Sequence, residues 1–422
     1  MLDIKFVRKY PDIIRENLRK RKEPEMTALL ESVLKNDETW RKLKKEIDEL
    51  REKRNKISQE INKARKQGKD AKKIIKEAKE IPKKIEQKEQ EMKDLSEKIR
   101  ICLLRIPNML AEDVPYGKDD TENVVIKEHG KKRKFTFKPK SHVDIIKELD
   151  LVDLKRAAKI SGARWYFLKN QLVILDMAIQ RFAIDLLIKK GFTPISPPHM
   201  ISKKAVQGAT SLQAFEEDIY KIEKEDLYAI PTSEFPLITQ FMNEVLQEKD
   251  LPIKMAGISP CYRKEAGAHG KDQKGIFRVH QFNKIEQVII CKQEESWKYF
   301  NELFKNGEEV IKKLEIPYRV VNLCTGDLGI KSSKTYDIEA WFPAQNAYRE
   351  IGSCSNCLSY QAVRSNIRYQ QEKERKYVHT LNNTMAATSR IMVAIIENFQ
   401  NKDGTISIPK ALQKYTGFEK IK

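Results

Sequence analysis

Apolar residues recur at alternating steps of three and four positions between residues 40 and 106, and this spacing predicts two long helices. The first seam consists of Leu43, Ile47, Leu50, Ile57, Ile61 and Ala64, with Arg54 as an interruption. The second consists of Ile74, Ala78, Ile81, Ile85, Met92, Leu95, Ile99, Cys102 and Ile106, with Lys88 as its gap. Each helix therefore has one face that packs against a partner.

Gly68 lies between the two seams and is the only glycine among the first 110 residues. Two long helices joined by so short a break fold back as an antiparallel helical hairpin, a coiled coil. Arms of about 27 residues or more reach roughly 40 Å at 1.5 Å per residue. Because proline removes a helical hydrogen bond, we expect Pro82 to kink the second helix near its start.

Beyond a turn-rich stretch near residues 108–120, short strand-like runs alternate with helical segments. The strand-like runs are 226–231, 253–263, 277–290 and 318–324, and the helical segments are 165–190 and 385–399. Hairpin-like pairs dominate over any βαβ rhythm, so the sequence predicts an α+β domain with an antiparallel sheet flanked by helices. We expect a hairpin domain at 1–110, a linker at 111–135 and the α+β domain at 136–422.

Charge is concentrated at the predicted hairpin tip. The chain of 422 residues carries 81 Lys+Arg and 61 Asp+Glu, a net charge of +20. Residues 53–76 alone hold 10 basic and 2 acidic residues. Such an excess favours a polyanionic partner, a nucleic acid, over a merely solvated face. The candidate contacts are Lys53, Arg54, Lys56, Lys63, Arg65, Lys66, Lys69, Lys72, Lys73 and Lys76.

The bulk composition suits a cytoplasmic globular protein. The chain is 40% apolar, which is enough for a sizeable core. Its first residues are charged throughout, unlike a signal peptide, and no apolar run approaches the roughly 18 residues of a membrane span. The six cysteines show no disulfide spacing, as expected in a reducing compartment.

Cys354 and Cys357 form a Cys-x-x-Cys pair that raises the question of zinc. A structural zinc ion needs four ligands, usually from two such pairs or from one pair and two histidines. The remaining cysteines are scattered singly and no suitably spaced histidine pair accompanies them. We expect no zinc, and we interpret the pair as buried free thiols.

Polar and apolar residues alternate after Ile276. Arg278, His280, Phe282, Lys284 and Glu286 are predicted to share one face of a strand, and Phe277, Val279, Ile285 and Ile289 the other. Arg263 and Glu265 share a face of the preceding strand. A solvent-facing sheet produces the same alternation. Guanidinium groups, a ring and carboxylates on one face also suit a nucleotide.

Several segments resemble the seryl-tRNA synthetase family of class II aminoacyl-tRNA synthetases. Residues 262–287 resemble its motif 2, 191–201 its motif 1 and 381–400 its motif 3. The stretches "IPTSEFPL" and "REIGSCSNC" and the N-terminal hairpin extend the resemblance over nearly the whole chain. Motif 3 reads "NNTMAATSR" where bacterial members are glycine-rich, which suggests the archaeal or eukaryotic branch.

The resemblance implies roles for individual residues. Arg263, Glu350 and Arg390 are expected to be catalytic, and Glu350 and Ser353 to hold a Mg²⁺ that arrives with ATP. Simple alternation puts Glu350 and Ser353 on opposite faces, so we expect a bulge near Gly352. The implied ATP contacts are Arg263, Lys264, Glu265, Arg278, Val279, Phe282, Glu350, Ile351, Gly352, Ser353 and Arg390. An internal ion pair is the alternative interpretation of Arg390.

The implied serine pocket consists of Thr232, Ser233, Glu234, Glu286, Asn382 and Thr384. A site built to hydrogen-bond a hydroxyl rejects analogues that lack one. The implied reaction is ATP-dependent attachment of L-serine to tRNA(Ser) through seryl-adenylate, with tRNA(Sec) left open as a second substrate. The implied assembly is a homodimer that includes residues 191–201.

Few residues follow motif 3, too few for a typical anticodon-binding domain, so the hairpin is expected to recognise the long variable arm of the tRNA. One alternative is a threonyl or prolyl enzyme, which predicts an anticodon domain and, in the threonyl case, a zinc triad. The other is an inactive RNA-binding paralogue, which is expected to lack Arg263, Glu350 or Arg390. All three are present.

Overall fold

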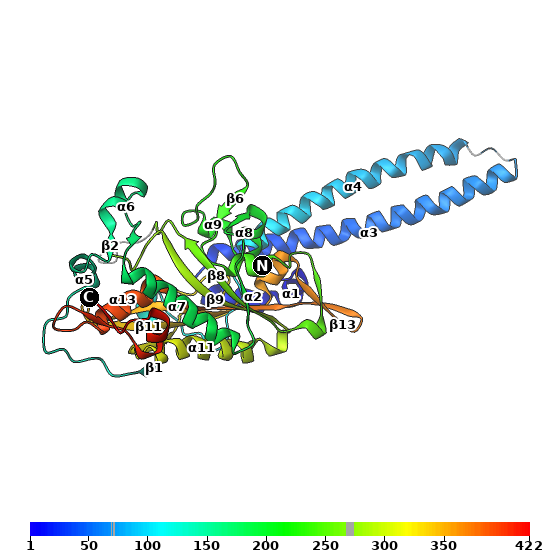
Figure 1. Cartoon of the computed structure of the whole chain (residues 1–422). Helices are drawn as coiled ribbons and strands as arrows, with labels where there is room; N and C mark the ends of the chain where they lie inside the picture. Colours follow the sequence, from blue (N-terminus) through cyan, green and yellow to red (C-terminus); the bar gives the residue numbers. More distant parts are fainter. Residues whose placement is uncertain (69, 71, 267–273) are drawn as a thin grey trace. The chain divides into compact units, whose positions relative to one another are not determined.

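The two helical seams of the N-terminal region form a hairpin. The computed structural model describes every residue except 69, 71 and 267–273. Helix α3 spans Pro24–Lys66 and α4 spans Lys72–Arg105 (Figure 1). Ile47, Ile57, Ile81 and Ile85 form one buried cluster between them. The first helix begins earlier than Trp40, and α4 continues through Pro82.

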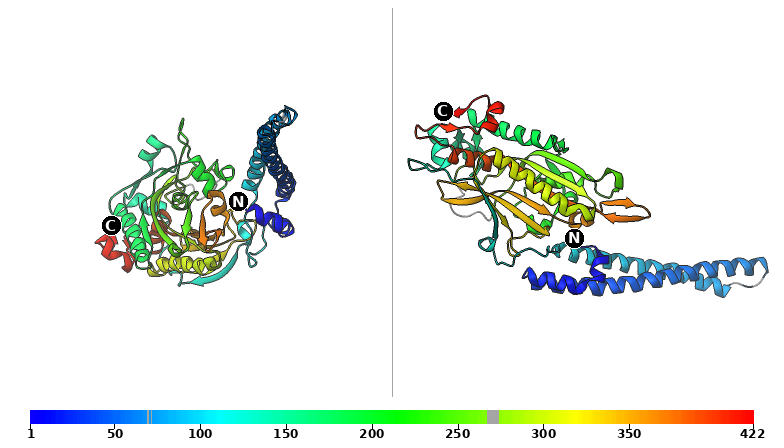
Figure 2. Two further views of the ribbon diagram at one scale, coloured as in Figure 1. Left: turned by 90° about the vertical axis from the view of Figure 1, so that its right-hand side faces the viewer. Right: turned by 90° about the horizontal axis from the view of Figure 1, so that it is seen from below.

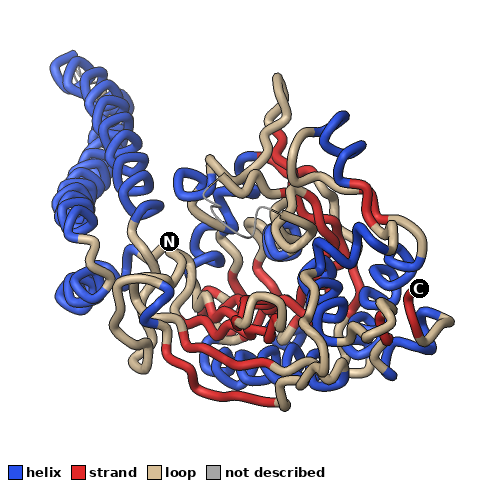
Figure 3. Tube along the Cα trace, turned by 90° about the vertical axis from the view of Figure 1, so that its left-hand side faces the viewer, coloured by secondary structure: helices blue, strands red, loops and turns tan. Residues whose placement is uncertain are grey.

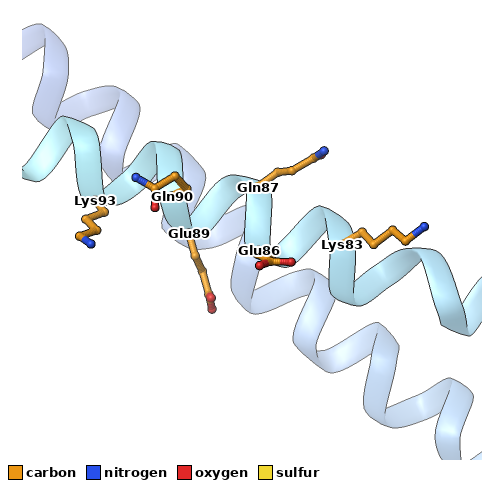
Figure 4. Close-up of a pocket in the computed structure, with 6 residues that line it drawn as sticks. All are labelled: Lys83, Glu86, Gln87, Glu89, Gln90 and Lys93. Atoms are coloured by element: carbon orange, nitrogen blue, oxygen red, sulfur yellow. The ribbon is translucent and has the colours of Figure 1, made fainter.

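Polar pairs fix the register of the hairpin. The Arg51 guanidinium lies 2.7 Å from Glu89, and Lys88 pairs with Glu46, which explains the gap in the second seam. Trp40 Nε1 donates to Ser96 Oγ over 2.9 Å. Figure 4 shows the polar side of α4, where both charge signs alternate with amides: Lys83, Glu86, Gln87, Glu89, Gln90 and Lys93. The one-signed excess is therefore a property of the tip.

Two short helices complete the first of two compact units, Met1–Pro107 and Asn108–Lys422. Helix α1 spans Ile4–Lys9 and α2 spans Pro11–Lys20. Arg8 makes two hydrogen bonds of 2.6 and 2.7 Å to the buried carboxylate of Asp37 on α3. Among the described residues, no helix combines the length and the apolar character needed to cross a bilayer.

An eight-stranded sheet organises the second unit (Figures 2 and 3). Its order is β1 (Val124–His129), β10 (Tyr318–Asn322), β11 (Lys334–Phe342), β12 (Ala347–Asn356), β15 (His379–Ala387), β9 (Gln281–Cys291), β8 (Ile253–Tyr262) and β4 (Thr193–Ile195). Neighbours are antiparallel except β4 and β8, which are parallel. The predicted α+β class is confirmed.

Three helices cover one face of this sheet, and the main core lies between them. They are α7 (Gln171–Ile188), α11 (Ser296–Lys313) and α13 (Thr388–Asn398). Ile285, Ile338 and Leu381 of the sheet belong to the same buried cluster as residues from all three helices. The opposite face carries the polar members of the alternating strands, as the period of two requires.

Smaller elements surround this framework. They are β2 (Val152–Asp153), β3 (Phe167–Leu168), β5 (Met200–Ser202), β6 (Leu227–Ala229), β7 (Val245–Gln247), β13 (Arg368–Gln371), β14 (Glu374–Tyr377), β16 (Ile406–Ser407), β17 (Lys420–Ile421), α5 (His142–Glu148), α6 (Leu154–Ser161), α8 (Lys203–Ala209), α9 (Leu212–Phe215), α10 (Glu234–Thr239), α12 (Tyr360–Ser365), α14 (Lys410–Thr416) and short 3₁₀ turns at Asp120–Glu122, Glu248–Asp250 and Gln293–Glu295.

Three predicted boundaries differ from the structure. Strand β9 begins at Gln281, so the alternation from Ile276 to His280 belongs to a loop and not to a strand. The expected linker at 111–135 contains β1, which pairs with β10 and lies in the second unit. Residues 385–387 end β15 before α13 starts, because the apolar run continues across the strand-to-helix junction.

Two bulges turn side chains toward the polar face. In the β11–β12 pair, Ile338 lies opposite Gly352 and Glu339 lies opposite Glu350, which leaves Ile351 as an extra residue. Glu350 and Ser353 therefore share a face, and the predicted bulge near Gly352 is confirmed. The β9–β15 pair has a second shift, between Thr384 and Ala386.

Candidate active site

A cavity of about 760 Å³ lies over the polar face of the sheet, entirely within the second unit. Seven basic side chains line it: Arg263, Arg278, Lys284, Arg319, Lys331, Arg349 and Arg390. Seven acidic ones do so too: Asp120, Glu234, Glu286, Asp327, Asp337, Glu339 and Glu350. So many charges of both signs exclude a purely apolar ligand and suit one that carries both phosphates and an ammonium.

Arg390 enters the cavity from the first turn of α13. Its Nη1 lies 2.9 Å from Glu350 Oε2 and donates to the Glu350 carbonyl oxygen over 3.1 Å. The internal ion pair considered from the sequence is thus present. Burial opposes ionisation of Glu350, but Arg390 outweighs it and the pKa of this carboxyl lies below its ordinary value. An anionic ligand can take over the guanidinium only by competing with Glu350.

Arg263 lies on the opposite side of the predicted phosphate site, just after β8. Its Nε donates to the Pro231 carbonyl oxygen over 3.2 Å, and its guanidinium lies 5.4 Å from the centre of the Phe282 ring. Arg278 also lines the cavity, with Nη1 3.8 Å from Glu265 Oε2. Three arginines from separate segments therefore converge on one space, as phosphate recognition requires.

Asp337 adds a second carboxylate beside the predicted metal residues. Ser353 Oγ donates to Asp337 Oδ1, and both residues line the cavity with Glu350. Burial, together with the charge of Glu350, raises the pKa of Asp337 well above its ordinary value. Across the described part of the chain, no group of three or more His, Cys, Asp or Glu side chains is placed to hold a metal alone. These hard oxygen donors fit a Mg²⁺ whose remaining ligands are phosphates.

Glu286 lies at the other end of the cavity, on β9. Lys284 Nζ is 2.6 Å from Glu286 Oε2, and Thr384 Oγ1 donates to the same oxygen over 3.4 Å. Burial raises the pKa of Glu286, although Lys284 opposes the shift. Asn382 and Thr232 line this end too. All predicted residues of the serine-binding pocket except Ser233 therefore line the cavity.

Some predicted site residues do not line the cavity. Ser233 is fully buried, and a Cβ added at Gly257 would lie 2.4 Å from its Oγ. Val279 and Ile351 are core residues. Lys264 lies 6.0 Å from the Tyr220 ring. Three others also lie outside the cavity lining: Glu265, Phe282 and Gly352. Glu265 has φ +52°, and its carbonyl oxygen accepts a hydrogen bond from Arg164 Nη1. The Phe282 ring lies beneath Arg263.

Cys354 and Cys357 are buried and free. Burial raises the pKa of both thiols, that of Cys357 to about 12. They stay protonated near neutral pH, whereas a zinc ligand is a thiolate. Cys357 is nevertheless not remote from the site, because Asn382 Nδ2 donates to its Sγ over 3.7 Å.

The predicted basic residues of the hairpin lie on its solvent side wherever they are described. Lys53, Arg54, Lys56, Lys63, Arg65, Lys66 and Lys76 are exposed. Lys69 and the side chains of Lys72 and Lys73 lie outside the described part. Lys56 pairs with Glu52 over 2.7 Å.

Eight charged residues that line the cavity were not predicted as site residues, although Lys284 was placed on the polar face: Asp120, Lys284, Arg319, Asp327, Lys331, Asp337, Glu339 and Arg349. A signal existed for Asp337, because Thr335, Asp337 and Glu339 alternate with apolar residues in β11. Lys331 lies in a loop, where no periodicity applies, and only the folded chain brings it to the cavity.

Two family profiles match separate parts of the chain. The profile described as the seryl-tRNA synthetase N-terminal domain matches residues 1–110. The profile described as the tRNA synthetase class II core domain (G, H, P, S and T) matches residues 217–399.

Whole-chain relatives are similar in both sequence and structure. A serine–tRNA ligase of Methanospirillum hungatei is 52% identical over 98% of both chains. The crystal structure of a seryl-tRNA synthetase from Pyrococcus horikoshii complexed with ATP is 48% identical, with a TM-score of 0.95 and coverage of 100% of this chain and 99% of that one. A prolyl-tRNA synthetase structure from Giardia lamblia, 17% identical with a TM-score of 0.57 over 66% of this chain and 57% of that one, shares the fold alone.

Proposed function

This chain belongs to the seryl-tRNA synthetase family, and we propose that the cavity over the polar face of the sheet is where serine and ATP react. The enzyme is a serine–tRNA ligase that attaches L-serine to tRNA(Ser) through seryl-adenylate. The observation that carries the assignment of the site is the meeting of three arginines with a carboxylate floor in one cavity. The arginines Arg263, Arg278 and Arg390 and the carboxylates Glu234 and Glu286 all line this cavity.

The arginine end takes ATP. Arg263 is placed to neutralise the charge that builds on the α-phosphate during in-line attack, and Arg278 and Arg390 to hold the outer phosphates. Arg390 exchanges Glu350 for phosphate when the nucleotide binds. Phe282, under Arg263, supplies a ring for the adenine.

Glu350 and Ser353, with Asp337 behind them, are placed to hold Mg²⁺. When bound with ATP, such an ion offsets phosphate charge and orients the triphosphate. The release of Glu350 from Arg390 frees a carboxylate for this purpose. One binding event thus rearranges both groups.

The carboxylate end takes serine. Glu286 and Glu234 face its ammonium, and Thr384, Asn382 and Thr232 offer polar partners to its hydroxyl and its amino group. Alanine leaves these buried groups unpaired and is rejected strongly, whereas threonine is excluded only by crowding one methyl group.

The reaction has two transfers. A serine carboxylate oxygen attacks the α-phosphorus of ATP, a new P–O bond forms, and the bond to the β-phosphate breaks with release of pyrophosphate. A hydroxyl of the terminal adenosine of tRNA then attacks the seryl carbonyl carbon, and AMP leaves. The electrostatic work in the first transfer falls to the arginines, because the protein has little bond making of its own to do.

The hairpin tip binds tRNA(Ser), in this proposal through its long variable arm. The exposed lysines and arginines of residues 53–76 contact backbone phosphates, which favours position over sequence. Parallel charging assays with tRNA(Ser) and tRNA(Sec) test the second substrate.

Two copies form a homodimer through α7 and β4. Ile174, Met177 and Ile188 are 41%, 60% and 48% exposed on α7, a helix that already buries another face in the core. β4 is the edge strand of the sheet. An exposed apolar stripe beside an open edge is the surface that a partner subunit covers.

The proposed compartment is the cytoplasm. All six cysteines are free, and five of them are buried. Unpaired buried thiols suit a reducing environment.

Amino-acid-dependent exchange of pyrophosphate into ATP tests the assignment. Serine is expected to support exchange, and threonine and proline to support little. The Arg263→Ala and Arg390→Ala variants are expected to lose about 100-fold or more of this rate. Exchange with threonine or proline at the serine rate contradicts the proposed pocket.

A further inference from the structure

We propose that Lys331 is a positioning residue of the serine pocket: it holds Glu234 so that the second carboxylate oxygen of Glu234 faces the substrate ammonium. The proposal rests on the proposed function, since it assigns Glu234 to the amino acid. Lys331 lies in the loop between β10 and β11 and lines the cavity.

Hydrogen bonds from Asn108 hold the backbone at Lys331 in place. Asn108 N–H donates to the Ile330 carbonyl oxygen over 2.9 Å, and Asn108 Nδ2 donates to the carbonyl oxygens of Lys331 and Cys357 over 2.9 and 2.8 Å. The side chain of Lys331 is 16% exposed. A lysine held at its backbone and buried along its stem has little freedom to swing out of the cavity.

The ammonium of Lys331 pairs with Glu234 Oε1. Burial disfavours its charge, but the neighbouring carboxylate of Glu234 outweighs burial and the pKa of Lys331 is raised. Lys331 therefore carries its charge at neutral pH. Glu234 is itself only 3% exposed, and a carboxylate so buried needs polar partners.

Gln361 donates a second hydrogen bond to the same oxygen. Its Nε2 donates to Glu234 Oε1 over 2.7 Å and to the Ala209 carbonyl oxygen over 2.9 Å, and its Oε1 accepts from Thr380 Oγ1 over 2.6 Å. With both ends of the amide occupied, its orientation is fixed. Two donors on Oε1 set the carboxylate plane of Glu234.

The second oxygen, Oε2, is left to the cavity. Among the described residues it accepts no hydrogen bond, and it is not one of the buried polar atoms that lack a partner. Because Oε2 has no hydrogen bond from the described residues and is not a buried atom, it is exposed to the cavity that Glu234 lines. It is therefore available to a substrate donor.

Charge balance supports the same role. The floor carries two carboxylates, Glu234 and Glu286, and each has its own lysine, Lys331 and Lys284. The floor is neutral before a zwitterionic amino acid arrives. Without Lys331, a buried carboxylate is left with only an amide donor, and it must take up a proton or turn away. Either change removes an acceptor for the ammonium.

Serine-dependent pyrophosphate exchange with the full-length chain tests this role. In Lys331→Met, which keeps the stem and removes the charge, we expect KM for serine to rise about 10- to 100-fold. We expect KM for ATP to stay within about twofold, because Lys331 lies at the amino acid end. The matched control is Lys334→Met. Lys334 is a buried lysine three residues on, at the start of β11; it pairs with Asp113 and does not line the cavity.

A second variant separates charge from packing. Lys331→Ala deletes a propylammonium-sized group, so added n-propylammonium is expected to restore much of the serine affinity. The same concentration of tetramethylammonium serves as the ionic-strength control. Rescue of KM for serine, without a change in KM for ATP, supports the positioning role.

Three results overturn the proposal. They are an unchanged KM for serine in Lys331→Met, an equal rise of both KM values, and failure of n-propylammonium to restore Lys331→Ala when its thermal unfolding matches the wild type. Failure of the wild-type chain to exchange with serine is a different outcome, because it contradicts the proposed function and not the role of Lys331.

Discussion

Asp337 accepts a hydrogen bond from Ser353 and is partly buried, as Glu350 is. It supports the predicted metal position from behind. Asp337→Asn is expected to raise the Mg²⁺ concentration that gives half-maximal pyrophosphate exchange by about 10- to 100-fold, the usual effect of losing a residue that supports a metal ligand. A titration of exchange rate against Mg²⁺ at fixed ATP measures it. An unchanged midpoint contradicts the assignment. Asp176→Asn, at a buried carboxyl that does not line the cavity, is the matched control.

For the paired cysteines, unlike Asp337, we predict no effect on metal binding. Cys354→Ser and Cys357→Ser are expected to leave metal content unchanged, because the wild-type thiols are protonated. We expect a modest rise in KM for serine only in Cys357→Ser, since Asn382 contacts that sulfur. Elemental analysis and exchange kinetics measure both. Stoichiometric zinc that disappears on mutation disproves this interpretation.

His379 gives the protein a pH-dependent stability at a site remote from the chemistry. Burial lowers its pKa to about 4, and its Nδ1 lies 3.0 Å from Ser296 Oγ. The unfolded chain takes up a proton near pH 6.5 that the folded chain refuses, so stability is full above pH 6.5 and falls as the pH drops toward 4.

His379→Asn keeps a hydrogen-bonding group near Ser296 but does not titrate. Its stability is expected to depend less on pH, by about 1–3 kcal/mol between pH 7.5 and 4.5. Urea unfolding at the two pH values measures the difference. Parallel losses in variant and wild type contradict the expectation.

At the scale of elements, the parts that follow local periodicity could be predicted and the rest could not. The hairpin follows its helical period, and β8 and β10 lie within the strand-like runs 253–263 and 318–324. β1 was not predicted, because all six of its residues are exposed and it shows no alternation of buried and exposed residues. The loop before Gln281 alternates without being a strand. The position of Lys331 depends on a hydrogen bond from Asn108, which is 223 residues away in the sequence. No local sequence pattern could have predicted this contact.

Helix α7 carries the prediction for assembly. A charge at its most exposed apolar position, in Met177→Glu, is expected to convert the dimer to a monomer at micromolar concentration, because a buried unpaired carboxylate opposes association. Sedimentation velocity measures the change. Lys305→Glu, at an exposed position of α11, is the control and should remain dimeric. A wild-type monomer with full activity contradicts the proposed interface.

At the scale of the whole molecule, the chain separates its two tasks between its two units. The cavity residues all lie in Asn108–Lys422, and the one-signed charge lies at the tip of α3 and α4. Serine activation should therefore proceed without the tip, and transfer to tRNA should not. The pairs Glu46–Lys88 and Arg51–Glu89 show how to shorten the hairpin without changing its register.

The division of labour is tested most directly by a chain in which a short glycine-rich turn replaces residues 53–84. Both half-reactions are measured on the same preparation. We expect serine-dependent pyrophosphate exchange at the wild-type rate. We expect tRNA charging to fall, and its KM to lose most of its salt dependence, because the phosphate contacts are gone. A full-length variant with the described tip lysines changed to glutamine isolates charge from length. Equal loss of exchange and charging in the shortened chain, with its circular dichroism spectrum otherwise native, contradicts the account.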